Sequence, residues 1–170
     1  MERAELITRV AFTGHRSYRH EADDRLHRTI RMLHAAGSRI FLSGMAVGFD
    51  LAAAEAVLAC KVDLPDIRLT AVIPFLGQQQ RFSPDDRIRF ERIAAAADVK
   101  IILSEIYQPN VYAFRNDYLI DHAATLVTWY DGTSGGTRYT IERALARGRK
   151  LIHLHPATPL SAYPPQRLFE

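Results

Sequence analysis

The chain of 170 residues is 48% hydrophobic and 24% charged, values that fit one globular domain. Its formal charge of +3 comes from 22 basic and 19 acidic residues, an excess too small to predict a strongly anionic partner such as nucleic acid. The charged start MERAELITRV does not resemble a signal peptide, no apolar run approaches the ~20 residues of a membrane span, and Cys60 is the single cysteine, so we expect a cytoplasmic protein without disulfides.

Short apolar runs rich in Val, Ile and Leu alternate with longer helical patterns along the whole chain. Such alternation predicts βα units around a mainly parallel sheet, and therefore a three-layer α/β fold. The expected strands are 6–13, 39–43, 68–74, 99–104, 125–130 and 150–154. The expected helices are 21–36, 49–60, 84–97, 114–122 and 136–147. Prolines that follow Leu154 predict an extended or frayed tail.

Local signals mark several helix boundaries. Gly37 and Gly148 stand where helices commonly end in a glycine. Ser83, followed by Pro84 and two aspartates, is typical of an N-cap with a proline and acidic residues in the first turn. We interpret all of these residues as architectural.

The glycines gather at one edge of the predicted sheet. Six of the nine lie just beyond the carboxyl ends of expected strands, namely Gly14, Gly44, Gly48, Gly132, Gly135 and Gly136. In open α/β sheets ligands bind at this edge, where helix N-termini present unpaired N–H groups to anions. The sequence contains neither G-x-G-x-x-G nor a Walker loop, and it lacks the commoner zinc and α/β-hydrolase motifs. We therefore expect an anionic ligand, without a metal, in a non-standard site.

The loop after the first strand reads Thr13-Gly14-His15-Arg16-Ser17. Gly14 allows a tight exit from the strand, and Arg16 places a forked cation where it can bind a phosphate. Either His15 or Ser17 can donate a hydrogen bond to the same ligand. The alternative is a surface loop that carries an incidental arginine.

The segment 43–50, SGMAVGFD, leads from the second strand into an apolar helix. Backbone N–H groups between Ser43, Gly44 and Gly48 can form an anion cradle, and Asp50 either accepts from sugar hydroxyls or caps the helix. Glu55 lies about 140° around the helix from Asp50, so spacing does not make these carboxylates an acid–base pair. Glu55 is either a paired structural charge or a functional group of raised pKa.

Two further segments follow the third and fourth strands. The segment 74–82 is either a lid with stacking aromatic rings or a loop anchored by Phe75 and Phe82. Arg115, next to Asn116, falls at an expected helix start, where the helix dipole disfavours a cation. Its partner is then a ligand or one of the acids Asp117 and Asp121.

The segment 131–137, DGTSGGT, carries the strongest signal for a ligand. Its three glycines and three hydroxyls open a helix, which is the chemistry of a phosphate or ribose-phosphate site. Thr133, Ser134 and Thr137 are the expected donors. Glu142 lies one turn after Arg138 and is expected to pair with it.

Together these motifs resemble the YpsA-related branch of the SLOG superfamily, Rossmann-like domains that also include the DNA-processing protein DprA (Smf) and the cytokinin-activating LOG phosphoribohydrolases. The resemblance covers the chain from Val10 to about Pro156. It rests on residues in four segments, namely Thr13-Gly14-His15-Arg16, the segment 43–50 with Ala53-Ala54-Glu55, Arg115-Asn116 with Asp121, and Asp131-Gly132 with Gly135-Gly136-Thr137.

The resemblance implies one SLOG-type Rossmann-like domain over 1–156, followed by a proline-rich tail at 157–170. It implies a nucleotide-derived ligand, such as ADP-ribose, an NAD-like molecule or a nucleoside phosphate, and it makes a homodimer plausible. The LOG pattern P-G-G-x-G-T-x-x-E is not reproduced, because Thr140 stands in the place of its glutamate. The DprA-like pattern at 43–50 is similar, but no companion domain or strongly basic stripe accompanies it.

These observations favour a sensor or binding protein. Its expected ligand-binding residues are Gly14, His15, Arg16, Ser43, Gly44, Gly48, Asp50, Arg115, Asn116, Asp131, Gly132, Ser134, Gly135, Gly136 and Thr137. The alternative is a LOG-like hydrolase of N-glycosidic or phosphate bonds in nucleotides, with Glu55, Asp50 and Asp121 as candidate catalytic residues. A DprA-like binder of single-stranded nucleic acid is the less favoured third possibility.

Overall fold

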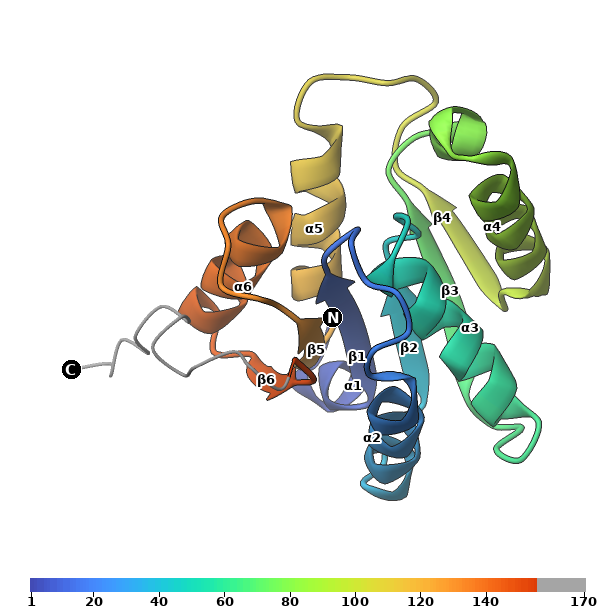
Figure 1. Ribbon diagram of the computed structural model, residues 1–170. Coiled ribbons are helices and arrows are strands. Elements are labelled where there is room, and N and C mark those ends of the chain that lie inside the picture. Colours follow the sequence, from blue (N-terminus) through green and yellow to red (C-terminus); the bar gives the residue numbers. More distant parts are fainter. Residues whose placement is uncertain (156–170) are drawn as a thin grey trace.

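Six parallel strands form the middle layer of the protein, whose computed structural model describes residues 1–155 (Figure 1). The strands are β1 Arg9–Gly14, β2 Ile40–Ser43, β3 Arg68–Ile73, β4 Val99–Ile102, β5 Thr125–Trp129 and β6 Lys150–His153. They lie in the order β4-β3-β2-β1-β5-β6, and every neighbouring pair is parallel. This confirms the predicted α/β class and gives it Rossmann-like topology.

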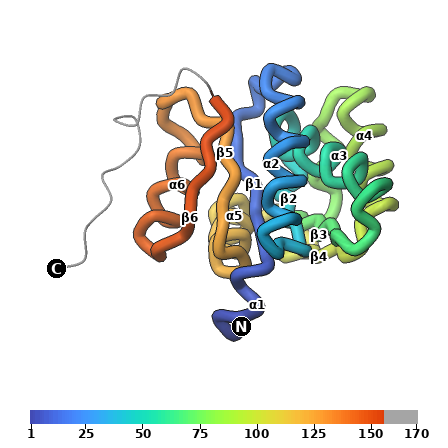
Figure 2. Tube along the Cα trace, turned by 90° about the horizontal axis from the view of Figure 1, so that it is seen from below, coloured from blue at the N-terminus to red at the C-terminus, as the bar shows by residue number. Residues whose placement is uncertain are grey.

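Helices cover both faces of the sheet. They are α1 Arg3–Ile7, α2 Asp23–Ala35, α3 Phe49–Lys61, α4 Pro84–Ala96, α5 Val111–Asp121 and α6 Gly136–Ala146, with a short 3-10 helix, η1, at Gln78–Arg81. Figure 2 shows α2, α3 and α4 gathered on one side of the strands and α5 with α6 on the other. None of the helices within residues 1–155 is long and apolar enough to cross a membrane.

Alternation along the strands divides the core into two apolar layers. Val10 and Phe12 of β1 pack in the layer that contains residues of α2, α3 and α4. Ala11 between them faces the second layer, together with Leu119 and Ile120 of α5. Because successive side chains of a strand point to opposite faces, a run of apolar residues is what burial on both faces requires.

The structure corrects two predicted boundaries, the start of the first strand and the start of the helix predicted at 114–122. The strand predicted over 6–13 is wrong at its start, since residues 3–7 form α1 and pairing begins at Arg9. The hydroxyl of Thr8 donates to the carbonyl of Glu5 at 2.9 Å and ends that helical turn. The helix predicted from residue 114 begins instead at Val111, directly after Asn110, whose φ is 67°.

The other predicted elements are present, and their ends differ by one or two residues. Gly37 and Gly148 have φ of 108° and 69° just after α2 and α6, as their helix-ending role requires. The backbone N–H of Asp86 donates to Ser83 Oγ at 3.2 Å, which confirms Ser83 as the N-cap of α4. The predicted tail at 157–170 lies outside the described residues.

Candidate functional site

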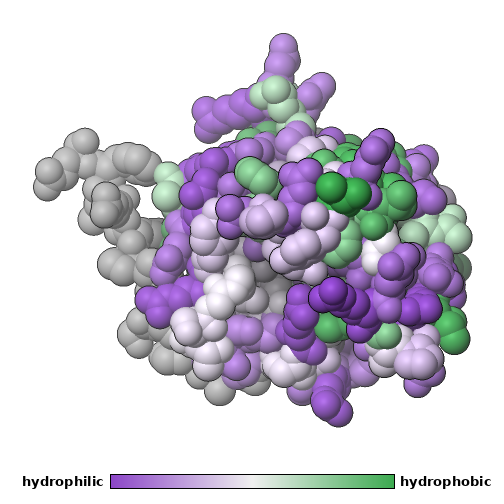
Figure 3. Space-filling model, turned by 90° about the horizontal axis from the view of Figure 1, so that it is seen from above, coloured by the Kyte–Doolittle hydropathy of each residue, from purple (hydrophilic) through white to green (hydrophobic). Residues whose placement is uncertain are grey.

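A pocket of about 500 Å³ opens at the carboxyl ends of the strands, close to β1. The strand order reverses there, because the chain adds β2, β3 and β4 on one side of β1 and then β5 and β6 on the other. The pocket is lined by Phe12, Thr13, Gly14, His15, Arg16, Ser17, Ala46, Asp50, Tyr112, Arg115, Asn116, Leu119, Gly136 and Thr137. Seen from above in Figure 3, the face at this end is mainly hydrophilic, with hydrophobic atoms gathered toward one side.

The β2–α3 loop forms a fixed wall of the pocket. Ser43 Oγ donates to the carbonyl of Asp50 at 2.9 Å and accepts from the N–H of Met45 at 3.2 Å. The N–H of Ala46 donates to Asp50 Oδ2 at 3.3 Å. Two of the N–H groups expected to cradle an anion are thus bound within the loop itself. The N-cap of α3 is Gly48, so the expectation that Asp50 caps this helix is wrong.

Gly48 lets the β2–α3 loop meet the loop after β1. Its φ is 83°, and a Cβ built on it would lie 2.5 Å from the carbonyl oxygen of Arg16. The N–H of Phe49 donates to the carbonyl of His15 at 3.2 Å and joins the two loops directly. The backbone of Arg16 is therefore fixed against the start of α3, and its exposed side chain extends from that support.

Asp50 and Arg115 are two buried charged groups in the lining, each 6% exposed. Burial raises the pKa of Asp50 to about 6, and the charge of Arg115, the N–H of Ala46 and the charge of Arg16 act against that rise. Burial likewise lowers the pKa of Arg115, and the negative charge of Asp50 opposes that change. These groups stabilise each other's ionised forms in a part of the protein where water is largely excluded.

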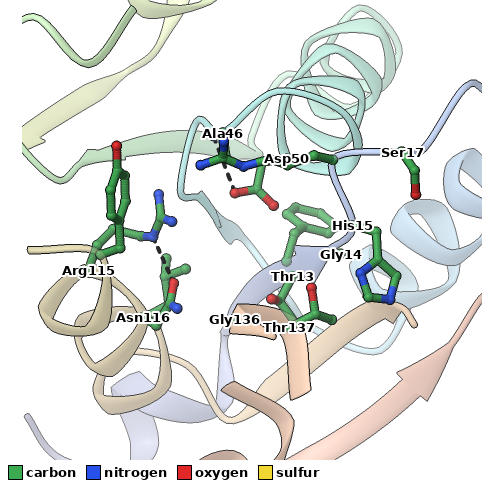
Figure 4. A pocket seen from close by; sticks show the side chains of 14 residues that line it. Thr13, Gly14, His15, Ser17, Ala46, Asp50, Arg115, Asn116, Gly136 and Thr137 are labelled. Atoms are coloured by element: carbon green, nitrogen blue, oxygen red, sulfur yellow. Dashed lines mark hydrogen bonds between the residues drawn. The ribbon is translucent and has the colours of Figure 1, made fainter. Parts of the chain in front are cut away.

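The structure places the predicted partners of Arg115 elsewhere. Arg115 donates from Nη1 to the carbonyl of Gly44. Its Nε donates to Asn116 Oδ1 at 2.8 Å (Figure 4). Asp117 instead pairs with Arg143 at 2.6 Å, and Asp121 pairs with Arg147. Because α5 begins at Val111, Arg115 lies in its second turn, and the expected conflict with the helix start does not arise.

His15 connects the pocket to Asp131 at the end of β5. Its Nε2 atom lies 2.8 Å from Asp131 Oδ1 and 3.1 Å from the N–H of Asp131. Burial raises the pKa of Asp131, but hydrogen bonds from Thr133 and the nearby His15 outweigh it and hold the pKa below its usual range. The Asp131 carboxylate thus orients His15 and Thr133, and it does not belong to the lining.

The 131–137 segment contributes less to the pocket than predicted. Gly136 and Thr137, the first residues of α6, line it, whereas Asp131, Gly132, Ser134 and Gly135 do not. Thr133, an expected donor to a ligand, donates its hydroxyl to Asp131 Oδ1 at 2.6 Å. What the segment supplies is the start of α6, whose first N–H groups have no partner within the helix.

The three candidate catalytic carboxyl groups have different surroundings. Glu55 forms ion pairs with Arg89 and Arg92 of α4 and is a paired structural charge outside the lining. Asp121 lines a separate groove beside α5. Only Asp50 of the three lies in the pocket. Glu142 pairs with Arg138 at 2.8 Å, as expected.

The sequence reasoning missed Tyr112 and Leu119, which line the pocket from α5. Tyr112 precedes Arg115 by three residues, a spacing that places two residues on one helix face. A helix predicted to begin at Val111 would have placed Tyr112 on the same face as Arg115. The segment 74–82 contains η1, and its Phe82 is an anchor that packs on Phe90. The pocket lining contains none of its residues.

Across residues 1–155, no group of three or more His, Cys, Asp or Glu residues is placed so that it could hold a metal ion. Cys60 is buried in α3 and lies 3.8 Å from His27 Nδ1.

Fold and pocket together define a Rossmann-like α/β domain with a ligand-sized pocket where its strand order reverses. The chain belongs to the YpsA family, described as the YspA SLOG family, whose sequence profile matches residues 10–154. It is 32% identical to the uncharacterized SPbeta prophage-derived protein YoqJ of Bacillus subtilis (strain 168) over 130 residues, which cover 68% of this chain and 76% of that protein. It is also 32% identical to a UPF0398 protein of Bacillus cereus (strain G9842), over 72% of this chain and 68% of that protein.

Solved structures share the fold. DprA from Streptococcus pneumoniae matches with a TM-score of 0.66 and 21% identity over 93% of this chain, which spans 54% of that chain. DprA from Helicobacter pylori, described in a single-stranded DNA binding mode, matches with a TM-score of 0.59 and 18% identity, over 89% of this chain and 68% of that one. The Moco carrier protein of Chlamydomonas reinhardtii matches with a TM-score of 0.51 and 15% identity, over 91% of this chain and 78% of that chain.

Proposed function

We propose that the protein binds a nucleotide-derived ligand in this pocket through a phosphate group and acts as a binding protein or sensor. The ligand class is a nucleoside phosphate, ADP-ribose or an NAD-like molecule. The observation that carries the proposal is that one cavity is lined by Arg16 and by Gly136 and Thr137 at the start of α6. A guanidinium and a helix N-terminus are both groups that bind phosphate oxygens.

The state of Arg16 supports this role. It is exposed, and within residues 1–155 it forms no ion pair and no side-chain hydrogen bond, although it lies close enough to Asp50 and Arg115 to affect their pKa values. The acidic groups nearby have other partners, since Asp50 accepts from the N–H of Ala46 and Asp131 contacts His15 and Thr133. An arginine fixed by its backbone, with its charged end free, suits a group that arrives with the ligand.

Asn116 and Asp50 are suited to the uncharged part of such a ligand. Figure 4 shows Asp50 on one side of the pocket, Arg115 and Asn116 on another, and Gly136 with Thr137 beneath them. The amide of Asn116 retains donors while its Oδ1 accepts from Arg115, and Asp50 retains acceptor capacity besides its bond to Ala46. Sugar hydroxyls or the edge of a base match these groups.

The test is titration of the purified protein with ADP-ribose, NAD and AMP, followed by thermal shift and calorimetry. We expect at least one of them to raise the melting temperature, and Arg16→Ala to weaken its binding about tenfold or more. Arg19→Ala is the matched control, because Arg19 is exposed on the same loop but does not line the pocket. No response at millimolar concentration, or equal losses in both variants, contradicts the proposal.

Hydrolysis of the bound nucleotide is a second candidate, favoured by the raised pKa of Asp50 inside the pocket. Asp50 would then act as the general acid or base. Incubation with nucleoside monophosphates and NAD, with chromatography of the products, tests this activity. Asp50→Asn should abolish the release of free base or phosphate, whereas no release by the unmodified protein rules hydrolysis out.

Binding of single-stranded nucleic acid remains the third candidate, because the fold is that of DprA. A gel-shift titration at several salt concentrations distinguishes it. Contact with several phosphates predicts affinity that falls steeply with salt, whereas a pocket for one small ligand predicts no stable complex.

A further inference from the structure

Three aromatic rings form a cluster beside the pocket. Phe75 follows β3, Tyr107 follows β4, and Tyr112 lies in the first turn of α5. The ring of Phe75 lies 5.4 Å from that of Tyr107 and 6.1 Å from that of Tyr112, and the two tyrosine rings are 6.4 Å apart. Three segments that are separate in the sequence therefore bring their aromatic side chains together at the carboxyl edge of the sheet.

These rings do not belong to either apolar layer of the core. Tyr107 is 62% exposed, and Phe75 and Tyr112 are half-buried. Neither buried cluster contains any of the three. Folding alone gains little from exposed aromatic surface, and such surface at a pocket rim commonly marks a binding site.

The cluster has a rigid support. The N–H of Leu76 donates to the carbonyl of Ser104 at 3.0 Å, which ties the loop after β3 to the loop after β4. Ser104 Oγ in turn donates to the carbonyl of Ile106 at 2.7 Å, next to Tyr107. One backbone bond and one bond from the Ser104 side chain thus fix the two loops that carry Phe75 and Tyr107, so a planar group that stacks on these rings costs little ordering of the protein.

Tyr112 connects the cluster to the phosphate end of the pocket. It lines the same cavity as Arg16, Gly136 and Thr137. The guanidinium carbon of Arg115 lies 5.8 Å from the centre of the Tyr112 ring, which fixes the ring relative to the buried pair below it. A ligand held by its phosphate at Arg16 can therefore place a planar group against Tyr112 without leaving the cavity.

We infer that Tyr112, backed by Phe75 and Tyr107, is a stacking subsite for the base of a nucleoside 5′-phosphate. The inference rests on the proposed function, because Arg16 and the start of α6 supply the phosphate contact. It assigns a place in the pocket to the base that all of the proposed ligands carry and that a bare sugar phosphate lacks. Purines are favoured, since the larger ring system covers more aromatic surface.

The experiment compares AMP with ribose 5-phosphate, two probes that share the sugar phosphate and differ in the base. Calorimetry should show that the unmodified protein binds AMP about tenfold or more tightly than ribose 5-phosphate. Tyr112→Leu should remove most of this preference, so that AMP binds little more tightly than ribose 5-phosphate. Tyr112→Phe, the matched control, keeps the ring and should keep the preference.

Tyr107→Ala serves as an independent variant, because the exposed Tyr107 side chain can be removed without opening the core. It should lower the preference for AMP several-fold. Equal binding of AMP and ribose 5-phosphate overturns the stacking subsite and leaves the phosphate proposal standing. Binding of neither probe overturns the subsite, and the phosphate proposal then also falls if ADP-ribose and NAD fail to bind. A Tyr112→Leu variant that loses both probes equally also overturns the subsite, since the ring would then support the phosphate end.

Discussion

Two glycine-containing loops at the same edge of the sheet differ in what surrounds them. The loop 43–50 is largely buried, and its polar groups bind one another and Arg115. The loop 131–137 is exposed up to Thr137, and Asp131 makes most of its contacts. The first loop is therefore a structural wall, and the second brings the free start of a helix to the cavity.

The glycines of the two loops serve different needs. A Cβ on Gly44 would lie 2.8 Å from the side chain of Arg115, and one on Gly48 would meet the backbone of Arg16. A Cβ on Gly136 would meet nothing nearer than Asn116 Nδ2, at 3.9 Å. Glycine in the first loop makes room for protein groups, whereas glycine in the second leaves the approach to α6 open.

The largest expected effect separates the two arginines of the pocket. Arg115→Met removes a buried cation and takes from Asp50 the strongest of the groups that stabilise its charge, so we expect the free energy of unfolding to fall by about 4 kcal/mol. Arg16→Met changes an exposed side chain, and we expect a change within about 0.5 kcal/mol. Urea unfolding of both variants measures the difference. Equal losses would mean that the wall does not depend on the buried pair.

Stability should also depend on pH through Asp50. Its folded pKa of about 6 exceeds its ordinary value of 3.8, so the folded state holds this proton more tightly than the unfolded state. Stability from this group is present below about pH 4 and is lost as pH rises through 6, by about 3 kcal/mol in total.

The Asp50→Asn variant lacks the titrating carboxyl group at this position, and all other groups titrate alike in the variant and the unmodified protein. The unfolding free energy of the unmodified protein minus that of Asp50→Asn should therefore fall between pH 4 and pH 6, where the two carboxyl pKa values lie. Urea titrations at pH 4, 5, 6 and 7 provide the measurement. A difference that stays constant with pH contradicts the buried state of Asp50.

The glycine contrast can be tested by one methyl group in each loop. Gly48→Ala forces a side chain into a positive φ and against the carbonyl oxygen of Arg16, so we expect a loss of about 2 kcal/mol or more. Gly136→Ala meets open space at a helix start, and we expect a change below about 0.5 kcal/mol. If Gly136→Ala proves the more destabilising of the two by thermal unfolding, the assignment of roles to the loops is wrong.

The smallest effect concerns the helix that the second loop opens. Arg138 and Glu142 form an exposed pair one turn apart on α6, and such pairs contribute about 0.3–0.5 kcal/mol. Glu142→Gln should lower stability by no more than that and leave ligand binding unchanged. A large loss of binding by calorimetry would assign Glu142 a role at the pocket that its position does not indicate.

Local signals were sufficient for most of the fold. The apolar runs located the strands, and Ser83, Gly37 and Gly148 marked helix ends, because caps and left-handed glycines depend on neighbours in the sequence. The start of α5 was missed because Pro109 and Asn110 precede it without an N-cap side chain bond. The 3–7 segment was missed because its apolar residues also fit the beginning of β1.

The arrangement inside the site depended on distant contacts that sequence spacing does not encode. Arg115 reaches the carbonyl of Gly44, 71 residues away, only because α5 packs across the sheet beside the end of β2. The internal bonds of Ser43 and Asp50 removed donors that the motif had offered to a ligand. The glycine pattern located the edge of the sheet, and packing decided which residues there face the cavity.

The position of β1 in the middle of the sheet has a consequence for synthesis of the chain. Its pairing with β2 can form early, but its other side stays open until β5 has been made. Contacts between such distant segments carry a larger loop-closure cost than contacts between neighbouring segments. The cavity takes one wall from each half of the chain, so it is complete only when the second half has folded. Protection of the chain from proteolysis by the ligand would therefore report the end of folding.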